Sequence, residues 1–123
     1  MGHPTHHHHI NYIEFPATDV ARAKQFYTSV FGWEFQDYGP DYSSFKAASA
    51  GVDGGFFKSA THEGPGKSAP LVVMYSADLK ATEAAVVAAG GSIAVPTFEF
   101  PGGCRFHFAD GVGNVLAVWS EKA

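Results

Sequence analysis

Two side chains in the body of this sequence could carry acid–base chemistry. Glu14 stands in the middle of a short apolar run, where a carboxylate is costly to bury unless it is paired. His107 stands in an aromatic run near the end of the chain. We predict both as catalytic residues, with Glu14 as a general base or ligand contact and His107 as its acid–base partner. The alternatives are structural: Glu14 is bonded to Arg105 or to a backbone N–H, or is exposed at a dimer seam, and His107 is an ordinary hydrogen-bonded histidine.

Most of the histidines lie outside this body. Five of the seven fall at position 3 and at positions 6–9. Residues 1–9 have no hydrophobic periodicity, so we interpret them as a His-rich leader or a purification-tag remnant that binds divalent metal without specificity. The single cysteine, Cys104, cannot form an internal disulfide, which favours a reducing, cytoplasmic location.

The composition excludes several functional classes. The chain has 123 residues, of which 46% are hydrophobic, enough for one core or for two half-sized units that share one. A net charge of −4 with eight scattered Lys and Arg residues argues against a nucleic-acid or anionic-membrane partner. No apolar run reaches the roughly 18 residues of a membrane span.

The first half of the chain reads as a strand, a helix and three further strands. Alternation predicts a strand over residues 10–15, ended by Pro16. Three-and-four spacing of apolar residues predicts a helix over residues 20–31, capped by Thr18 or Asp19 and ended by Gly32. The three further strands are predicted over residues 33–38, 42–48 and 52–58.

The second half repeats this pattern after a polar, Gly/Pro-rich segment at residues 59–69. A strand is predicted at 71–76, followed by a helix that begins after Asp78 and ends at Gly90-Gly91. The remaining strands are predicted at 92–95, which Pro96 closes, and at 98–100, 104–109 and 115–120.

Equal spacing relates the two halves. Asp19 and Asp78 are 59 residues apart, and so are Gly32 and Gly91. We therefore predict two modules of the order βαβββ, at residues 10–58 and 70–120, joined by a linker at 59–69 and forming one domain. The alternative is an α+β sandwich without a repeat.

Several segments resemble the vicinal oxygen chelate superfamily, which includes glyoxalase I, extradiol dioxygenases and the bleomycin- and fosfomycin-resistance proteins. The segments at residues 10–19, 26–27 and 30–33 are similar to its opening module. Residues 108–114 resemble its closing Phe-x-Asp-Pro-Asp-Gly-Asn turn, with Gly111-Val112 in place of Pro-Asp. The resemblance covers residues 10–120 and is nearest to the branch related to lactoylglutathione lyase. It implies an α+β fold of two tandem βαβββ modules that form a curved mixed sheet of open half-barrels, with the helices outside. It also implies a ligand on the concave face and a homodimer.

The resemblance also implies where a divalent metal would be held. The corresponding positions are Tyr12, the segment near 55–57, Val72 and Ala117. None of them offers a histidine, glutamine or carboxylate, whereas a divalent ion needs about three or four N or O ligands. We therefore predict no metal and no cofactor. Ni²⁺ or Zn²⁺ would be expected only under the alternative of a metal-dependent lyase or isomerase, or of a dioxygenase-related enzyme.

Without a metal, the concave face becomes an apolar, aromatic cleft. Strand alternation places Tyr12 and Glu14 on this face and puts Ile13 and Phe15 under the helix. Such a cleft suits a small, partly apolar molecule held by stacking and one or two hydrogen bonds. We predict a metal-independent binding module; the alternatives are an enzyme that uses Glu14 and a dimeric regulatory protein with a vestigial cleft. The predicted ligand-binding residues are Tyr12, Glu14, Phe57, Val72, Met74, Ala117 and Trp119.

Overall fold

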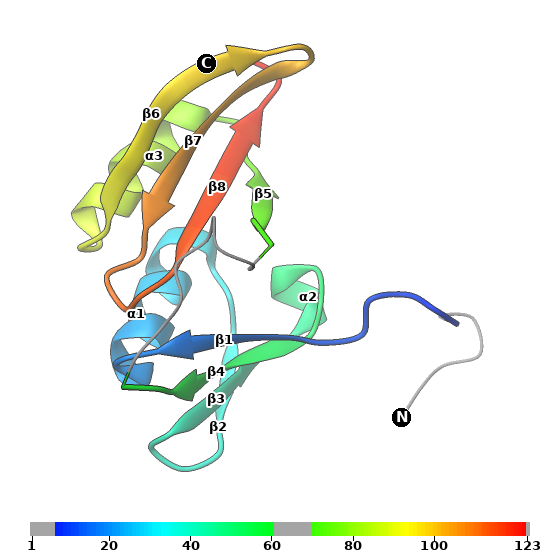
Figure 1. The fold of residues 1–123 in the computed structure, drawn as a ribbon, viewed down its shortest axis with the longest axis vertical. Helices are drawn as coiled ribbons and strands as arrows, with labels where there is room; N and C mark the ends of the chain where they lie inside the picture. Colours follow the sequence, from blue (N-terminus) through cyan, green and yellow to red (C-terminus); the bar gives the residue numbers. More distant parts are fainter. Residues whose placement is uncertain (1–6, 61–69, 123) are drawn as a thin grey trace.

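Two four-stranded sheets of identical strand order form the framework of the protein. The structure is a computed structural model that describes residues 7–60 and 70–122. The first sheet has the order β1-β4-β3-β2 and the second has the order β5-β8-β7-β6 (Figure 1). The strands are β1 (Ile13–Ala17), β2 (Phe35–Asp37), β3 (Tyr42–Phe45), β4 (Gly54–Lys58), β5 (Val73–Tyr75), β6 (Ser92–Phe100), β7 (Gly103–Ala109) and β8 (Val115–Ser120).

The repeat of strands and helices confirms the predicted α+β class. In each half the first strand runs parallel to the last, β1 with β4 and β5 with β8, and the other pairs are antiparallel. The elements of the first half end at Lys58, and those of the second begin at Val73. Within the predicted leader and linker, residues 1–6 and 61–69 lie outside the described residues.

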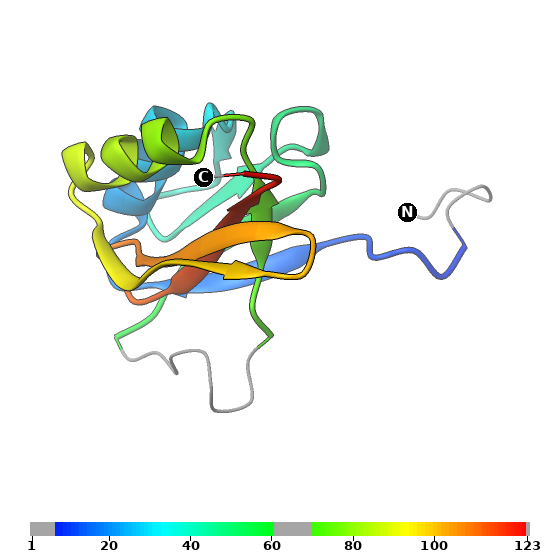
Figure 2. The same cartoon turned by 90° about the horizontal axis from the view of Figure 1, so that it is seen from above.

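Both long helices begin where the sequence predicts. The helix α1 (Val20–Phe31) is capped by the Asp19 carboxylate, which accepts from the backbone N–H of Arg22 at 3.1 Å. The helix α3 (Leu79–Ala88) is capped in the same way by Asp78, which accepts from Ala81 at 3.1 Å. Figure 2 shows α1 and α3 on the same side of the two sheets. No helix in residues 7–60 or 70–122 is long and apolar enough to cross a membrane.

Two prolines were wrongly predicted to end strands. Strand β1 starts at Ile13 instead of residue 10 and continues through Pro16, and β6 continues through Pro96. Both strands lie at sheet edges, where a missing N–H is tolerated, and β6 shifts register on either side of Val95. The short helix α2 (Ala47–Ala50) replaces the predicted end of the third strand.

The aromatic core lies between the sheets and the long helices. Tyr27 on α1 stacks on Trp33 with ring centroids 4.8 Å apart and lies 5.1 Å from the ring of Phe56 on β4. Phe31, also on α1, lies 5.8 Å from Phe108 on β7. The core is therefore shared between the two modules, as expected for half-sized units that cannot bury their apolar faces alone.

A buried turn after β7 joins the modules. The Asp110 carboxylate accepts hydrogen bonds from the Tyr27 hydroxyl at 2.8 Å and from the backbone N–H groups of Val112 and Asn114 at 2.9 and 3.0 Å. The Asn114 amide donates to Asp110 at 3.1 Å and to the Pro16 carbonyl at 2.8 Å. Burial raises the pKa of the Tyr27 phenol, and the Asp110 charge raises it further, so Tyr27 stays a donor.

Candidate functional site

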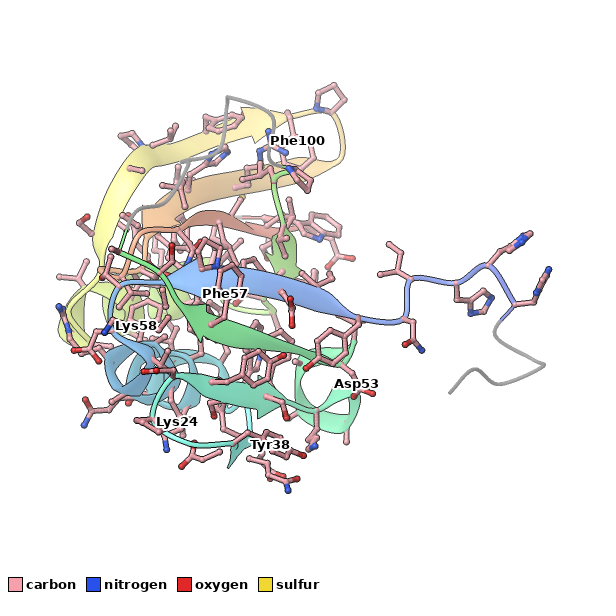
Figure 3. The ribbon with its side chains drawn as sticks, turned by 60° about the horizontal axis from the view of Figure 1, so that its bottom comes forward. Lys24, Tyr38, Asp53, Phe57, Lys58 and Phe100 are labelled. Carbon is pink, nitrogen blue, oxygen red and sulfur yellow. The ribbon has the colours of Figure 1, made fainter. Side chains whose placement is uncertain are left out.

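The side of the two sheets that faces away from α1 and α3 carries the predicted site. We call it the uncovered face, because no helix of the described residues packs on it (Figure 2). Pleating and register place on it every second residue of each strand. Figure 3 labels Phe57, on β4 of the first sheet, and Phe100, on β6 of the second. Its side chains include Tyr12, Glu14, Tyr42 and Phe57 of the first module, and Val73, Tyr75, Phe98, Phe100, Arg105, His107 and Trp119 of the second.

Glu14 has a phenol as its partner. The Tyr42 hydroxyl donates to the Glu14 carboxylate at 3.0 Å and also hydrogen-bonds the hydroxyl of Tyr12. Tyr42 reaches Glu14 across Gly55, where a Cβ atom would lie only 2.3 Å from the Tyr42 hydroxyl. Burial raises the pKa of Tyr42, and the hydrogen bonds to Tyr12 and Glu14 raise it further, so the phenol stays protonated. The predicted structural partners of Glu14, Arg105 or a backbone N–H, are thus corrected to Tyr42.

His107 lies in the second sheet, between Ala117 on β8 and Val95 on β6. Its ring centroid is 6.0 Å from that of Phe98, and its Nε2 atom is buried without a hydrogen-bond partner in the described part of the chain. The predicted acid–base pair is not formed, because Glu14 belongs to the other sheet and no hydrogen bond joins the two described side chains.

The environment of His107 disfavours its charged form. Burial lowers the pKa of the imidazole, and the positive charge of Arg105 lowers it further. The strand neighbours Ala117 and Val95 offer no charge that would counter this effect.

Replacing His107 by glutamine is therefore expected to reduce the loss of stability on acidification from pH 7.5 to 5.5. The folded-state pKa lies below the ordinary value of 6.5, so the unfolded chain binds more protons below that pH and acid favours unfolding. Urea unfolding at both pH values measures the effect. His8→Gln, which replaces an exposed histidine, is expected to behave as the wild type. If His107→Gln lost as much stability as the wild type between pH 7.5 and 5.5, the lowered pKa of His107 would be contradicted.

Two of the predicted ligand-binding residues face the wrong way. Val72 and Met74 pack against the core and line a cavity of about 160 Å³ together with Ile13 and Phe15, on the helix side. The neighbouring side chains on the uncovered face are those of Val73 and Tyr75, which are 40% and 53% exposed. The physical reason is strand alternation: a shift of one residue exchanges the two faces.

The other predicted ligand-binding residues lie on the uncovered face but differ in accessibility. Tyr12 and Phe57 are 44% and 37% exposed, and Trp119 is half-buried with its ring 5.1 Å from that of Tyr75. Ala117 is fully buried between its strand neighbours Val73 and His107, so its side chain is not accessible to a ligand on this face. Tyr42 and Tyr75 were not among the predicted ligand-binding residues, because their place on this face follows from pairing with Phe57 and Trp119 on distant strands.

The residues at the implied metal positions do not fit a divalent ion. The described residues contain no group of three or more His, Cys, Asp and Glu side chains that could hold one. Near the position expected between residues 55 and 57, the Tyr42 phenol occupies the space over Gly55. The Tyr42 phenol donates to Glu14, and the implied positions Val72 and Ala117 carry no ligating atom, so these residues are a poor donor set for Ni²⁺ or Zn²⁺.

Comparison with known proteins shows similarity over most of the chain. The sequence model of the Glyoxalase/Bleomycin resistance protein/Dioxygenase superfamily matches residues 9–118. A glyoxylase-like domain-containing protein of Didymella fabae is 35% identical, with 91% of this chain and 93% of that protein covered. CFP32 of Mycobacterium tuberculosis, named as a candidate glyoxylase, is 29% identical over 91% of this chain, which spans only 45% of its length.

Solved structures agree with the fold at low sequence identity. A glyoxalase/bleomycin resistance protein/dioxygenase family enzyme from Burkholderia phytofirmans superposes with a TM-score of 0.74 at 16% identity, covering 89% of this chain and 96% of the other. The fosfomycin resistance protein FosX from Listeria monocytogenes gives a TM-score of 0.73 at 14% identity, covering 90% and 91%.

Proposed function

Because this chain belongs to the Glyoxalase/Bleomycin resistance protein/Dioxygenase superfamily, we propose that it binds a small, partly apolar molecule on the uncovered face without a divalent metal. The observation that carries the proposal is the concentration of exposed aromatic rings on this face. Tyr12, Phe57, Tyr75 and Phe98 are all at least 37% exposed there. Exposed aromatic surface of this kind usually serves recognition.

The aromatic side chains in the second sheet supply an ordered binding surface. The rings of Tyr75 and Trp119 meet edge to face, and Phe100 lies 6.3 Å beyond Trp119. Tyr75 is held by a hydrogen bond of 2.8 Å to Glu121. Rings fixed by their neighbours lose little conformational freedom when a flat molecule stacks on them, which favours binding.

The chemistry of the available donors supports binding without metal. Glu14 accepts from Tyr42, and Val72 and Ala117 have no ligating atoms, so the positions implied by the family would hold an ion poorly. Catalytic roles for Glu14 and His107 stay predictions. The cytoplasmic homodimer likewise stays a prediction, and the free, buried Cys104 is compatible with a reducing compartment.

Titration with 2-naphthamide, a neutral aromatic probe, tests the proposed function. The probe is expected to quench the fluorescence of Trp119 saturably, whereas Trp33 is only 5% exposed and packs against Tyr27 on the helix side. Trp119→Phe removes this reporter and is expected to leave only linear quenching, which identifies Trp119 as the source of the saturable signal. Val87→Ser, which alters an exposed apolar residue on α3, is the matched control and is expected to quench as the wild type.

Two results would overturn the proposed function. Linear, unsaturable quenching that is equal in the wild type and Trp119→Phe would mean that the uncovered face binds no aromatic molecule. Loss of saturable quenching after dialysis against EDTA would contradict binding without metal.

A further inference from the structure

Two side-chain nitrogens on β7 point toward the uncovered face without a partner. The Nε atom of Arg105 and the Nε2 atom of His107 are both buried, and neither has a hydrogen-bond partner among residues 7–60 and 70–122. The two residues are separated by one position on the strand, so their side chains leave the same face of the sheet. Buried polar atoms are nearly always paired in native proteins, so an adjacent unpaired couple needs an explanation.

Arg105 is held by aromatic rings instead of by a carboxylate. Its guanidinium carbon lies 5.3 Å from the ring centroid of Phe98 and 5.7 Å from that of Phe100. Trp119 is its strand neighbour on the other side. In the described part of the chain no acidic side chain pairs with Arg105, and Glu121 is engaged by Tyr75 at 2.8 Å. Stacked rings fix the plane of a guanidinium and leave its N–H groups available to a planar acceptor.

From these contacts we propose that Arg105 and His107 bind the carboxylate of a small aromatic acid whose ring stacks among Trp119, Phe98 and Phe100. This inference rests on the proposed function and names the chemical class of the molecule bound. A carboxylate is planar and accepts two parallel bonds from a guanidinium, and it can accept a third from an imidazole N–H. A neutral amide offers a single carbonyl acceptor and no negative charge, so it satisfies the nitrogens of Arg105 and His107 less well than a carboxylate does.

Two hollows elsewhere on the described surface fit this class less well. A hollow of about 680 Å³ lies on the outer side of α1, lined in part by Lys24, Trp33 and Phe35. Its lysine already forms an ion pair of 2.8 Å with Asp37. The cavity of about 160 Å³ beside Val72 and Met74 is lined by apolar and aromatic side chains and has no charged side chain to pair with an anion.

The test compares 2-naphthoate with 2-naphthamide, which share a ring system and differ in charge. At pH 7.5 the wild type is expected to bind 2-naphthoate at least tenfold more tightly. In Arg105→Gln the ratio of the two dissociation constants is expected to fall to about one, and in His107→Gln to fall partway. Arg22→Gln is the matched control, because Arg22 is exposed on α1 and away from the uncovered face. Circular dichroism establishes that each variant is folded.

Each outcome separates this inference from the proposed function. Equal binding of both probes by the wild type would overturn the aromatic-acid class while supporting a binding face for neutral molecules. Binding of neither probe would overturn both. If the preference for 2-naphthoate over 2-naphthamide fell as far in Arg22→Gln as in Arg105→Gln, the carboxylate would not be bound specifically by Arg105, and the inference would be overturned. If Arg105→Gln does not fold, the salt dependence of the wild type decides: sodium chloride must weaken naphthoate binding and spare naphthamide, and equal effects would contradict the site.

Discussion

Replacing Asp110 by alanine is expected to lower the free energy of unfolding by about 3–5 kcal/mol. The carboxylate is 3% exposed and accepts from Tyr27, Val112 and Asn114. Its removal leaves several buried donors without an acceptor. Each unsatisfied donor costs about 1–3 kcal/mol, although the individual costs are not additive. Urea unfolding followed by tryptophan fluorescence measures the change.

Two comparisons make the Asp110 result specific. Tyr27→Phe removes one of the hydrogen bonds and is expected to cost about 1–2 kcal/mol. Asp37→Ala removes an exposed carboxylate that pairs with Lys24 and accepts from Ser43, whose hydroxyl also reaches the Gln36 carbonyl, so the expected cost is at most about 1 kcal/mol. A loss in Asp110→Ala no greater than that in Asp37→Ala would show that the turn does not hold the modules together.

Replacing Gly54 by alanine is expected to cost about 3 kcal/mol, because the space for a side chain is already filled. A Cβ atom there would lie 2.2 Å from the backbone oxygen of Ile13 and 2.4 Å from the ring of Phe45. The oxygen belongs to the neighbouring strand β1, so the clash pushes apart the parallel pair that carries Glu14. Thermal unfolding followed by circular dichroism measures the fall in melting temperature of Gly54→Ala.

Gly39→Ala separates this clash from the general cost of losing a glycine. Gly39 has a φ of 83°, and no atom of residues 7–60 and 70–122 lies within 4 Å of the place that a Cβ atom would take, so its replacement strains only the backbone, by about 1–2 kcal/mol. If Gly54→Ala proved as stable as Gly39→Ala, the result would contradict the close approach of β1 to β4 at Gly54.

The sequence predicts those parts of the fold that depend on local signals. Asp19 and Asp78 cap their helices through contacts three residues away, so spacing alone locates both helix starts. The prolines misled the prediction because Pro16 and Pro96 are tolerated only where the strand lies at an edge. Which strands lie at an edge depends on the pairing of strands that are distant in sequence, and local sequence signals do not indicate this pairing.

The sequence indicated which side of the first sheet carries the candidate site, but not which side chains contact one another there. Alternation placed Tyr12 and Glu14 correctly, but Val72 was assigned by analogy although a spacing of 59 residues from Tyr12 leads to Leu71. That spacing would have put Val73 on the uncovered face. The partner of Glu14 was missed because Tyr42 is 28 residues away and reaches it over a neighbouring strand through a gap left by Gly55.

Strand β6 has a consequence for how the protein behaves at high concentration. It is the longest strand and lies at the edge of its sheet, where a straight row of N–H and C=O groups would template the addition of another chain. Pro96 removes one donor from that row, and the register shifts around Val95 bend it. The edge strand β2 is only three residues long. These two edges therefore resist the addition of a strand from another copy.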